Sequence, residues 1–340
     1  MVRNVYRMVP GAGNIRNLRL VEEELDSPGD EELQVKVRCL GLNFADISAM
    51  FGLYSATPEG SFIPGLEYAG DVIAVGKNVR GIREGDPVMG VTRFGGYSDH
   101  LNVDKHYVIP LPEGWNYKDG AAFLVHAFTA YYALVVLAGI REGQTVLIHS
   151  AAGGVGIQSN RIAKRFNAYT IGTVGSDKKI ALLESEGYND WIVRSDRFRE
   201  DLREKLGKRE LNIVLECIGG QILKDGFRLM SPEGRMIVYG SADFMTPGNK
   251  PNYLRLIWKY WKRPRLDPLR MIEWNKSVMS FNLIHLYHKK ERIGEYFRQI
   301  QDLDIGKPHV GHVYPFPELI QAVKYYQKGK TTGKVVVNVS

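Results

Sequence analysis

The stretch HSAAGGVGIQSNRIAKRF, from His149 to Phe166, decides the fold class of this 340-residue chain. Residues 151–156 within it are all small apart from one valine, which lets another group approach the backbone closely. Residues 145–149 (TVLIH) before them are typical of a buried strand. The residues after them predict a helix over 155–166, with one apolar face formed by Val155, Ile162, Ala163 and Phe166. A glycine-rich turn between a strand and a helix is where a doubly wound domain binds a dinucleotide pyrophosphate.

The turn departs from the G-x-G-x-x-G fingerprint only at its first position, where it reads Ala151-x-Gly153-x-x-Gly156. The N-terminus of the helix offers free N–H groups and a partial positive charge, and both favour a phosphate. We therefore predict that a dinucleotide binds to Ala152, Gly153, Gly154, Val155 and Gly156. The alternative is a tight strand–helix turn that binds no ligand.

Strands and helices alternate around this turn, from residue 121 to the apolar run at 235–240. Continuous apolar strands in such an alternation predict a parallel sheet with helices on both faces. Residues 1–120 and the C-terminal segments 309–316 and 333–339 have the pattern of strands joined by tight turns. The predicted fold class is α/β, with a β-rich domain from both chain ends (1–124 and 285–340) and a Rossmann domain between them (125–284).

The end of the second strand of the predicted Rossmann domain, TVGSDKK (173–179), bears on which dinucleotide binds. NAD-binding domains place an acidic residue there on the ribose hydroxyls, and Asp177 keeps that alternative open. Ser176 and Lys179, with Arg194 after the third strand, instead suit the 2′-phosphate of NADPH. We expect NADPH rather than NADH.

The composition is that of a globular protein, with 44% hydrophobic and 24% charged residues. No run approaches the roughly 18 apolar residues of a membrane-spanning helix, and residues 1–14 lack the apolar core of a signal peptide. The two cysteines, Cys39 and Cys217, lie in apolar runs, which fits a reducing compartment better than a disulfide. We expect a cytoplasmic protein.

Five sequence blocks support a family resemblance. They are GLNFADISAMFGLY (41–54), PGLEYAGDVIAVG (64–76), REGDPVMG (83–90), AAGGVG (151–156) and TGKVVV (332–337). In this order they resemble medium-chain dehydrogenase/reductases of the zinc-free quinone oxidoreductase branch, which includes zeta-crystallin, and most of all the vesicle amine transport protein homologues. The resemblance implies that the β-rich part is a GroES-like catalytic domain and that the protein is a homodimer.

The zinc-ligand positions of this superfamily carry unsuitable residues in this chain. Zinc-dependent relatives have a cysteine where this chain has Asn43 and a histidine where it has Leu66. Leucine cannot bind a metal, and a catalytic zinc needs three protein ligands, so we predict that no zinc is bound. Without a Lewis acid, alcohol oxidation is disfavoured. A quinone or conjugated enone, in contrast, accepts hydride readily when it is held against a nicotinamide.

Asn43 and Tyr54 are the candidate catalytic residues. The Asn43 amide could hold the nicotinamide ribose or the acceptor oxygen, and the Tyr54 hydroxyl could donate a proton. The alternatives are that Asn43 forms a turn and that Tyr54 packs under a loop. We expect Asp46 to order its own loop rather than to act as a base.

The resemblance implies further cofactor contacts at Thr129, Tyr239, Gly240, Ser241, Phe281, Leu283 and Lys334. Thr129 is similar to a threonine that contacts the nicotinamide amide, and Phe281 and Leu283 to a segment whose backbone holds the carboxamide. For each residue, a purely structural role is the alternative. His126 would face the cleft near Thr129, and we expect it to be a packed residue.

A basic, tryptophan-rich insert, residues 249–276, interrupts the predicted Rossmann domain. Its apolar residues (Leu254, Leu256, Ile257, Trp258, Tyr260, Trp261 and Trp274) could form an amphipathic helix beside Lys259, Lys262, Arg263 and Arg265. We expect the insert to pack in a dimer. A flap over a bulky apolar substrate and an interfacial membrane helix are the alternatives. Nothing in it matches an RNA-binding module, so we do not expect a nucleic-acid partner.

The sequence thus predicts a zinc-free, NADPH-dependent oxidoreductase that transfers hydride to a small apolar quinone, enone or carbonyl compound. The alternative is a nucleotide-binding adaptor that associates with membranes or lipids and has little catalytic activity. The sequence does not identify the acceptor.

Overall fold

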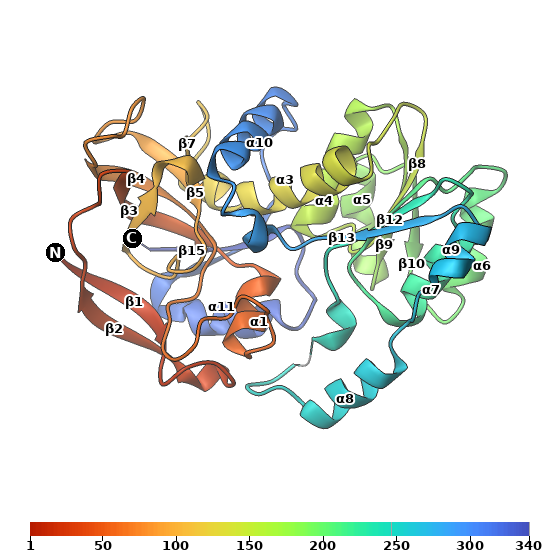
Figure 1. Ribbon diagram of the computed structural model, residues 1–340, viewed down its shortest axis with the longest axis horizontal. Coiled ribbons are helices and arrows are strands. Elements are labelled where there is room, and N and C mark those ends of the chain that lie inside the picture. The colour runs from red at the N-terminus through yellow and green to blue at the C-terminus, as the bar shows by residue number, and fades with distance from the viewer. Residues whose placement is uncertain (246, 340) are drawn as a thin grey trace.

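The computed structural model describes residues 1–245 and 247–339. Figure 1 shows a β-rich part that contains both chain ends and a second part built around a parallel sheet. The β-rich part holds a seven-stranded sheet in the order β14-β15-β3-β4-β5-β7, with β6 paired to β3, and a two-stranded ribbon of β1 and β2. The predicted α/β class, with a GroES-like part and a Rossmann part, is confirmed.

The strands of the β-rich part are β1 (Val2–Met8), β2 (Leu18–Glu24), β3 (Glu32–Gly41), β4 (Glu67–Val75), β5 (Pro87–Val91), β6 (His100–Asp104), β7 (Val108–Pro110), β14 (Val310–Pro315) and β15 (Lys334–Asn338). Its helices are α1 (Phe44–Met50), α2 (Tyr117–Ala121) and α11 (Leu319–Tyr326). The strand β15 lies between β14 and β3, which joins the two ends of the chain in one sheet.

The six-stranded sheet is parallel throughout and has the order β10-β9-β8-β11-β12-β13. Its strands are β8 (Thr145–Ile148), β9 (Tyr169–Val174), β10 (Asp190–Val193), β11 (Ile213–Glu216), β12 (Arg235–Val238) and β13 (Ser277–Ser280). The connecting helices are α4 (Gly154–Arg165), α5 (Ile180–Ser185), α6 (Phe198–Leu206) and α7 (Gly220–Leu229). The strand order reverses at β8, so the crevice beyond the carboxyl ends of β8 and β11 is the place where such sheets bind ligands.

Alternate side chains of β8 enter different cores, as expected for a strand buried on both faces. Val146 and Ile148 pack with the cluster that contains Ile162 of α4. Leu147 packs with Leu202 of α6 on the opposite face. Because neither face of the strand meets water, Val146, Leu147 and Ile148 are apolar in succession rather than alternating with polar residues.

Residues 121–139 have the apolar sequence of a buried helix, but they do not form one α-helix. They form α3 (Leu124–Tyr131) followed by π-helical turns from Tyr132 to Leu137. The helix α10 (Lys290–Asp302) packs on α3, with the rings of Phe128 and Phe297 5.6 Å apart. The segment after residue 285 therefore contacts both parts, since Lys290 at the start of α10 also pairs with Asp104 of β6, and it joins the seven-stranded sheet only at β14.

The insert forms two short helices, α8 (Tyr253–Lys262) and α9 (Pro268–Glu273). In Figure 1, α8 lies at the lower edge of the view, set apart from both sheets. Trp258 and Trp261 belong to α8, whereas Trp274 follows α9 and packs against Phe227 of α7. Within the described residues, no helix is long and apolar enough to cross a membrane.

Candidate active site

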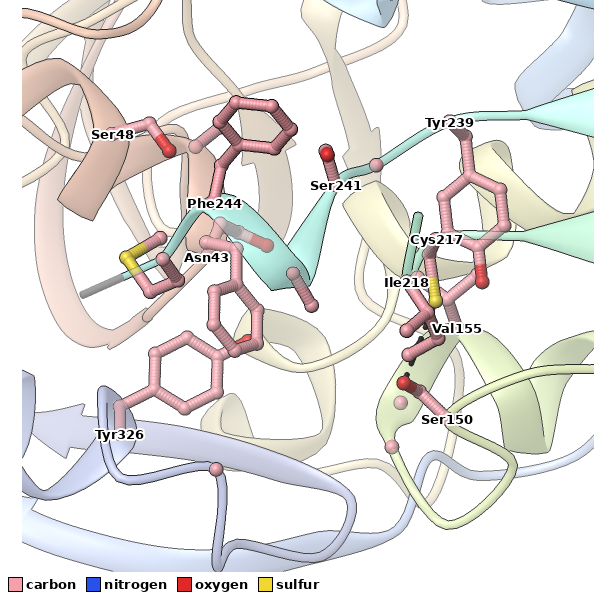
Figure 2. Close-up of a pocket in the computed structure, with 18 of the residues that line it drawn as sticks. Asn43, Ser48, Ser150, Val155, Cys217, Ile218, Tyr239, Ser241, Phe244 and Tyr326 are labelled. Carbon is pink, nitrogen blue, oxygen red and sulfur yellow. Dashed lines mark hydrogen bonds between the residues drawn. The ribbon is translucent and has the colours of Figure 1, made fainter. Parts of the chain in front are cut away.

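A cavity of about 1480 Å³ lies between the β-rich part and the parallel sheet. Residues that follow the carboxyl ends of all six parallel strands line it, among them Ser150, Ser176, Arg194, Cys217 and Tyr239. Figure 2 shows Asn43, Ser48, Phe244 and Tyr326 on one side of this cavity, and Ser150, Val155, Cys217 and Tyr239 on the other. The cavity is therefore at the position that the strand order predicts for a ligand.

The glycine turn lines the cavity with Ala152, Gly153, Gly154, Val155 and Gly156, and α4 begins within it. Added side chains would not fit. A Cβ on Gly156 would lie 2.6 Å from Ala151 Cα, and one on Gly154 would overlap the imidazole of His126. The first N–H groups of α4 have no intrahelical partner, and the three glycines of the turn leave space beside them, so these residues fit a pyrophosphate.

A basic corner lies at the ends of β9 and β10, where Ser176, Lys178, Lys179 and Arg194 line the cavity. Arg194 Nη1 donates to Thr173 Oγ1 (2.9 Å), and Lys179 donates to the carbonyl oxygens of Gly329 (3.0 Å) and Thr331 (2.7 Å). Burial and the neighbouring Arg194 cation lower the pKa of Lys179. A phosphate bound between these cations would relieve their mutual repulsion.

Asp177, the residue that would favour NAD, is not among the cavity-lining residues. Its Oδ1 accepts from the backbone N–H of Lys178 (2.8 Å) and from Ser176 Oγ (3.1 Å). The carboxylate is thus engaged in its own turn, and the corner presents cations rather than an anion.

The predicted nicotinamide end of the site also lies on the cavity wall, with Thr129, Tyr239, Gly240, Ser241, Phe281 and Leu283. The rings of Tyr239 and Phe281 stack with centroids 6.3 Å apart. Thr129 Oγ1 donates its proton to Val125 O (2.7 Å), which leaves its lone pairs to accept from a ligand amide.

Tyr54 lines the cavity, and its hydroxyl donates to Asn282 Oδ1 (2.6 Å). Burial raises the pKa of Tyr54 to about 12. The hydroxyl is therefore a weak acid whose proton is already in a hydrogen bond. Tyr54 can pass this proton to a substrate only after the bond to Asn282 has broken.

Asn43 is at the N-terminus of α1 and lines the cavity, although it is only 4% exposed. Its backbone N–H donates to Asp46 Oδ2 (2.7 Å), which also accepts from Tyr97 Oη (3.0 Å). Burial raises the pKa of Asp46 to about 7. Asp46 thus orders the loop that carries Asn43, as expected from the sequence.

Lys334 is in a different place from the other predicted cofactor residues. It is 1% exposed, lies behind Asn43 and is not among the cavity-lining residues. Its Nζ donates to Asn43 Oδ1 (2.8 Å), forms a buried ion pair with Glu67 and is 3.4 Å from His126 Nε2. We call these four residues the Lys334 cluster. Lys334 therefore does not line the cavity itself, whereas its partners Asn43 and His126 do.

The sequence does not predict roles for Glu67 and Asn282, and it predicts His126 only as a packed residue. Glu67 and Lys334 are 267 residues apart, and their pairing has no local sequence signal. Asn282 is similarly distant from Tyr54. The position of Glu67 next to the apolar Leu66 is the one sequence feature that indicates a distant partner, because an isolated buried carboxylate needs one.

Comparisons with known proteins agree with this architecture. A family model described as "Alcohol dehydrogenase GroES-like domain" matches residues 29–113, and one described as "Zinc-binding dehydrogenase" matches residues 190–337. The human synaptic vesicle membrane protein VAT-1 homolog is 32% identical over 92% of this chain and 80% of its own length. The human quinone oxidoreductase is 28% identical over 91% of this chain and 90% of its own length.

A solved structure shares the whole fold. The Escherichia coli quinone oxidoreductase complexed with NADPH has a TM-score of 0.84 with this chain at 24% identity, and the match covers 100% of both chains. The chain belongs to the quinone oxidoreductase-like family of medium-chain dehydrogenase/reductases. The resemblance inferred from the five sequence blocks is confirmed.

In this quinone oxidoreductase-like chain, both Asn43 and Leu66 line the cavity. Residues 1–245 and 247–339 contain no group of three or more His, Cys, Asp or Glu side chains that could hold a metal ion. The absence of zinc stays a prediction, which depends on the leucine at position 66. The Lys334 ammonium places a positive charge next to Asn43.

Proposed function

We propose that the protein is a zinc-independent, NADPH-dependent oxidoreductase that transfers hydride to quinones or conjugated enones. One observation carries the proposal: a single cavity connects the glycine turn, the basic corner and Asn43. The human quinone oxidoreductase and the Escherichia coli quinone oxidoreductase with NADPH support it by their likeness to this chain.

The cofactor would lie along the carboxyl ends of the parallel strands. The N–H groups at the start of α4 would bind its pyrophosphate, and Ser176, Lys179 and Arg194 its 2′-phosphate. Thr129, Phe281 and Leu283 would hold the nicotinamide, with residues 239–241 closing the cleft. Bound NADPH supplies the hydride.

Asn43 and Tyr54 would act at the acceptor end. The amide oxygen of Asn43 accepts from Lys334, so its NH₂ group is the part available to a ligand. A hydrogen bond from that group to the oxygen of a quinone or enone would stabilise the negative charge that develops there. Tyr54 would supply a proton to the acceptor, or it would keep its hydrogen bond to Asn282 and form part of the cavity wall.

The acceptor end of the cavity is mainly apolar. Its lining residues include Phe44, Leu53, Phe244, Leu256 and Ile257, the last two from α8. This supports an apolar acceptor, and it supports the interpretation of α8 as a flap beside the substrate. A small apolar quinone, enone or carbonyl compound is the substrate class that we propose.

The test is a steady-state assay of NADPH oxidation with ortho-quinones, para-quinones and enones, with NADH in parallel and NADPH binding measured by calorimetry. We expect turnover that is faster with NADPH than with NADH. Tight NADPH binding without turnover on any acceptor would contradict the proposed reaction. Asn43→Ala should slow turnover, whereas Ser48→Ala on the same wall is the matched control.

A membrane- or lipid-associated adaptor is the second candidate. The human relative at 32% identity is named "Synaptic vesicle membrane protein VAT-1 homolog". In this chain, Leu254 (83%), Trp261 (74%), Leu269 (74%) and Ile272 (77%) of α8 and α9 are strongly exposed beside several basic residues. Exposed apolar side chains beside basic residues are suited to the interface of an anionic bilayer. The cytoplasmic location that we expect does not require such membrane contact.

Flotation with anionic phospholipid vesicles tests this candidate. Binding that is lost in Leu254→Ser/Trp261→Ser would support it, with Leu20→Ser on the exposed face of β2 as the control. Absence of flotation in the unmodified protein would exclude it.

We also propose a homodimer, formed through β13. This strand is at the edge of the parallel sheet and leaves one row of backbone groups unpaired within the described chain. Sedimentation analysis tests the proposal, and a monomer at micromolar concentration would contradict it.

A further inference from the structure

The Lys334 ammonium has three protons and three partners, all of them buried. It donates to Asn43 Oδ1, to Glu67 Oε2 and toward His126 Nε2. The other oxygen of Glu67, Oε1, accepts from the backbone N–H of Val125 (2.9 Å). Since an ammonium group only donates, each partner must turn a lone pair toward it.

The missing side chain of Gly41 provides the space that Lys334 and Glu67 occupy. A Cβ at that position would be 2.7 Å from Lys334 Cε and 3.1 Å from Glu67 Oε2. The lysine stem thus passes across a glycine, and the ion pair is enclosed between β3, β4 and β15. The ammonium keeps a fixed position, because its partners and the surrounding backbone leave no other buried position in which its charge is paired.

The first consequence concerns His126 on α3, which is 6% exposed. Its Nε2 faces the ammonium and must accept, so the neutral ring carries its proton on Nδ1. Burial and the Lys334 charge lower the pKa of His126 well below its usual range, which keeps the ring neutral. The Nδ1 atom has no hydrogen-bond partner within the described residues.

The unpartnered Nδ1 lies against Gly154, the first residue of α4, because a Cβ on Gly154 would overlap it. His126 itself lines the cavity. A buried donor without a partner costs free energy, and this one lies beside the start of α4, where the proposed cofactor phosphate would bind.

The second consequence concerns Asn43. With Oδ1 held by Lys334, its Nδ2 is placed 3.3 Å from Gly41 O, to which it donates one proton. The second amide proton remains available at the cavity wall. The buried cation therefore orients both Asn43 and His126 as hydrogen-bond donors.

We propose that Lys334 is a positioning residue that sets the tautomer of His126 and the amide orientation of Asn43, and that His126 Nδ1–H binds a phosphate oxygen of the dinucleotide at Gly154. This inference rests on the proposed binding of NADPH. It adds His126 to the cofactor site and gives Lys334 an indirect role.

The tautomer is measurable without any ligand, by ¹⁵N NMR of the protein labelled at histidine nitrogen. His126→Asn identifies its signals among those of the eight histidines. We expect the neutral Nδ1–H form in the unmodified protein from pH 6 to 8. We also expect it to be lost in Lys334→Met/Glu67→Gln, which removes the cation without leaving an unpaired carboxylate. An Nε2–H ring in the unmodified protein would overturn the inference.

Calorimetry with NADPH tests the binding role. His126→Leu should weaken NADPH binding about tenfold, as expected for one lost hydrogen bond to a charged group. His126→Asn should recover part of the loss, because the amide nitrogen can take the place of Nδ1. The exposed His288 provides the control variant His288→Leu.

The outcomes separate the two proposals. NADPH binding by the unmodified protein with unchanged affinity in folded His126→Leu would overturn only the role of His126. Absence of NADPH binding by the unmodified protein would overturn the proposed function and this inference together.

Discussion

The glycine turn and the Lys334 cluster meet where His126 touches Gly154, but they are built in different ways. The turn is six consecutive residues (151–156), and it contributes backbone N–H groups and the space left by its three glycines. The cluster takes one side chain each from β4, α3, β15 and the start of α1. The turn should therefore be sensitive to added atoms, and the cluster to lost charge or lost hydrogen bonds.

The largest effect should come from removing the anion of the cluster. Glu67→Gln leaves the Lys334 ammonium buried without a counter-charge, which should lower the free energy of unfolding by about 3 kcal/mol. Urea unfolding measures the change, and Glu59→Gln at an exposed position is the control. An unchanged unfolding midpoint would mean that the pair contributes nothing to stability.

Adding one methyl group to the turn should have the next largest effect. Gly154→Ala places a Cβ on the imidazole of His126, and we expect about 100-fold weaker NADPH binding, equivalent to roughly 2.7 kcal/mol. Gly294→Ala in α10, where a Cβ meets nothing within 4 Å, is the matched control. Wild-type affinity in Gly154→Ala would show that the turn does not hold the cofactor.

The basic corner should affect cofactor choice rather than stability. Arg194→Met should weaken NADPH binding about tenfold and leave NADH binding nearly unchanged, because only NADPH carries a 2′-phosphate. The ratio of the two dissociation constants is the measurement, and exposed Arg197→Met is the control. Equal losses for both cofactors would place the 2′-phosphate elsewhere.

The smallest effect should come from Tyr54→Phe. The Tyr54 proton is engaged with Asn282 and its pKa is raised to about 12, so we expect only about a threefold lower kcat, as for one neutral hydrogen bond. The kcat profile from pH 6 to 9 should show no titration of this group. A loss of 100-fold or more would make Tyr54 the proton donor.

Much of the site could be predicted because its residues follow local patterns. The glycine turn, the strand ends at Ser176 and Arg194 and the segment at 239–241 all lie where a strand ends. The order of strands along the chain places those ends at one edge of the sheet. The π-helical turns after Tyr131 and the separate helices α8 and α9 could not be predicted, since their apolar residues fit a continuous helix equally well.

The sequence by itself determined the parallel sheet, the glycine turn, the family and the residue types along the cavity, because each depends on neighbours in the chain or on periodicity. Only the tertiary structure decided that Lys334 lies behind Asn43, that Glu67 neutralises it and that His126 faces Gly154. These contacts join residues up to 291 positions apart. The partner of a buried charge is determined by how whole sheets pack against each other. This packing cannot be predicted from any short stretch of sequence.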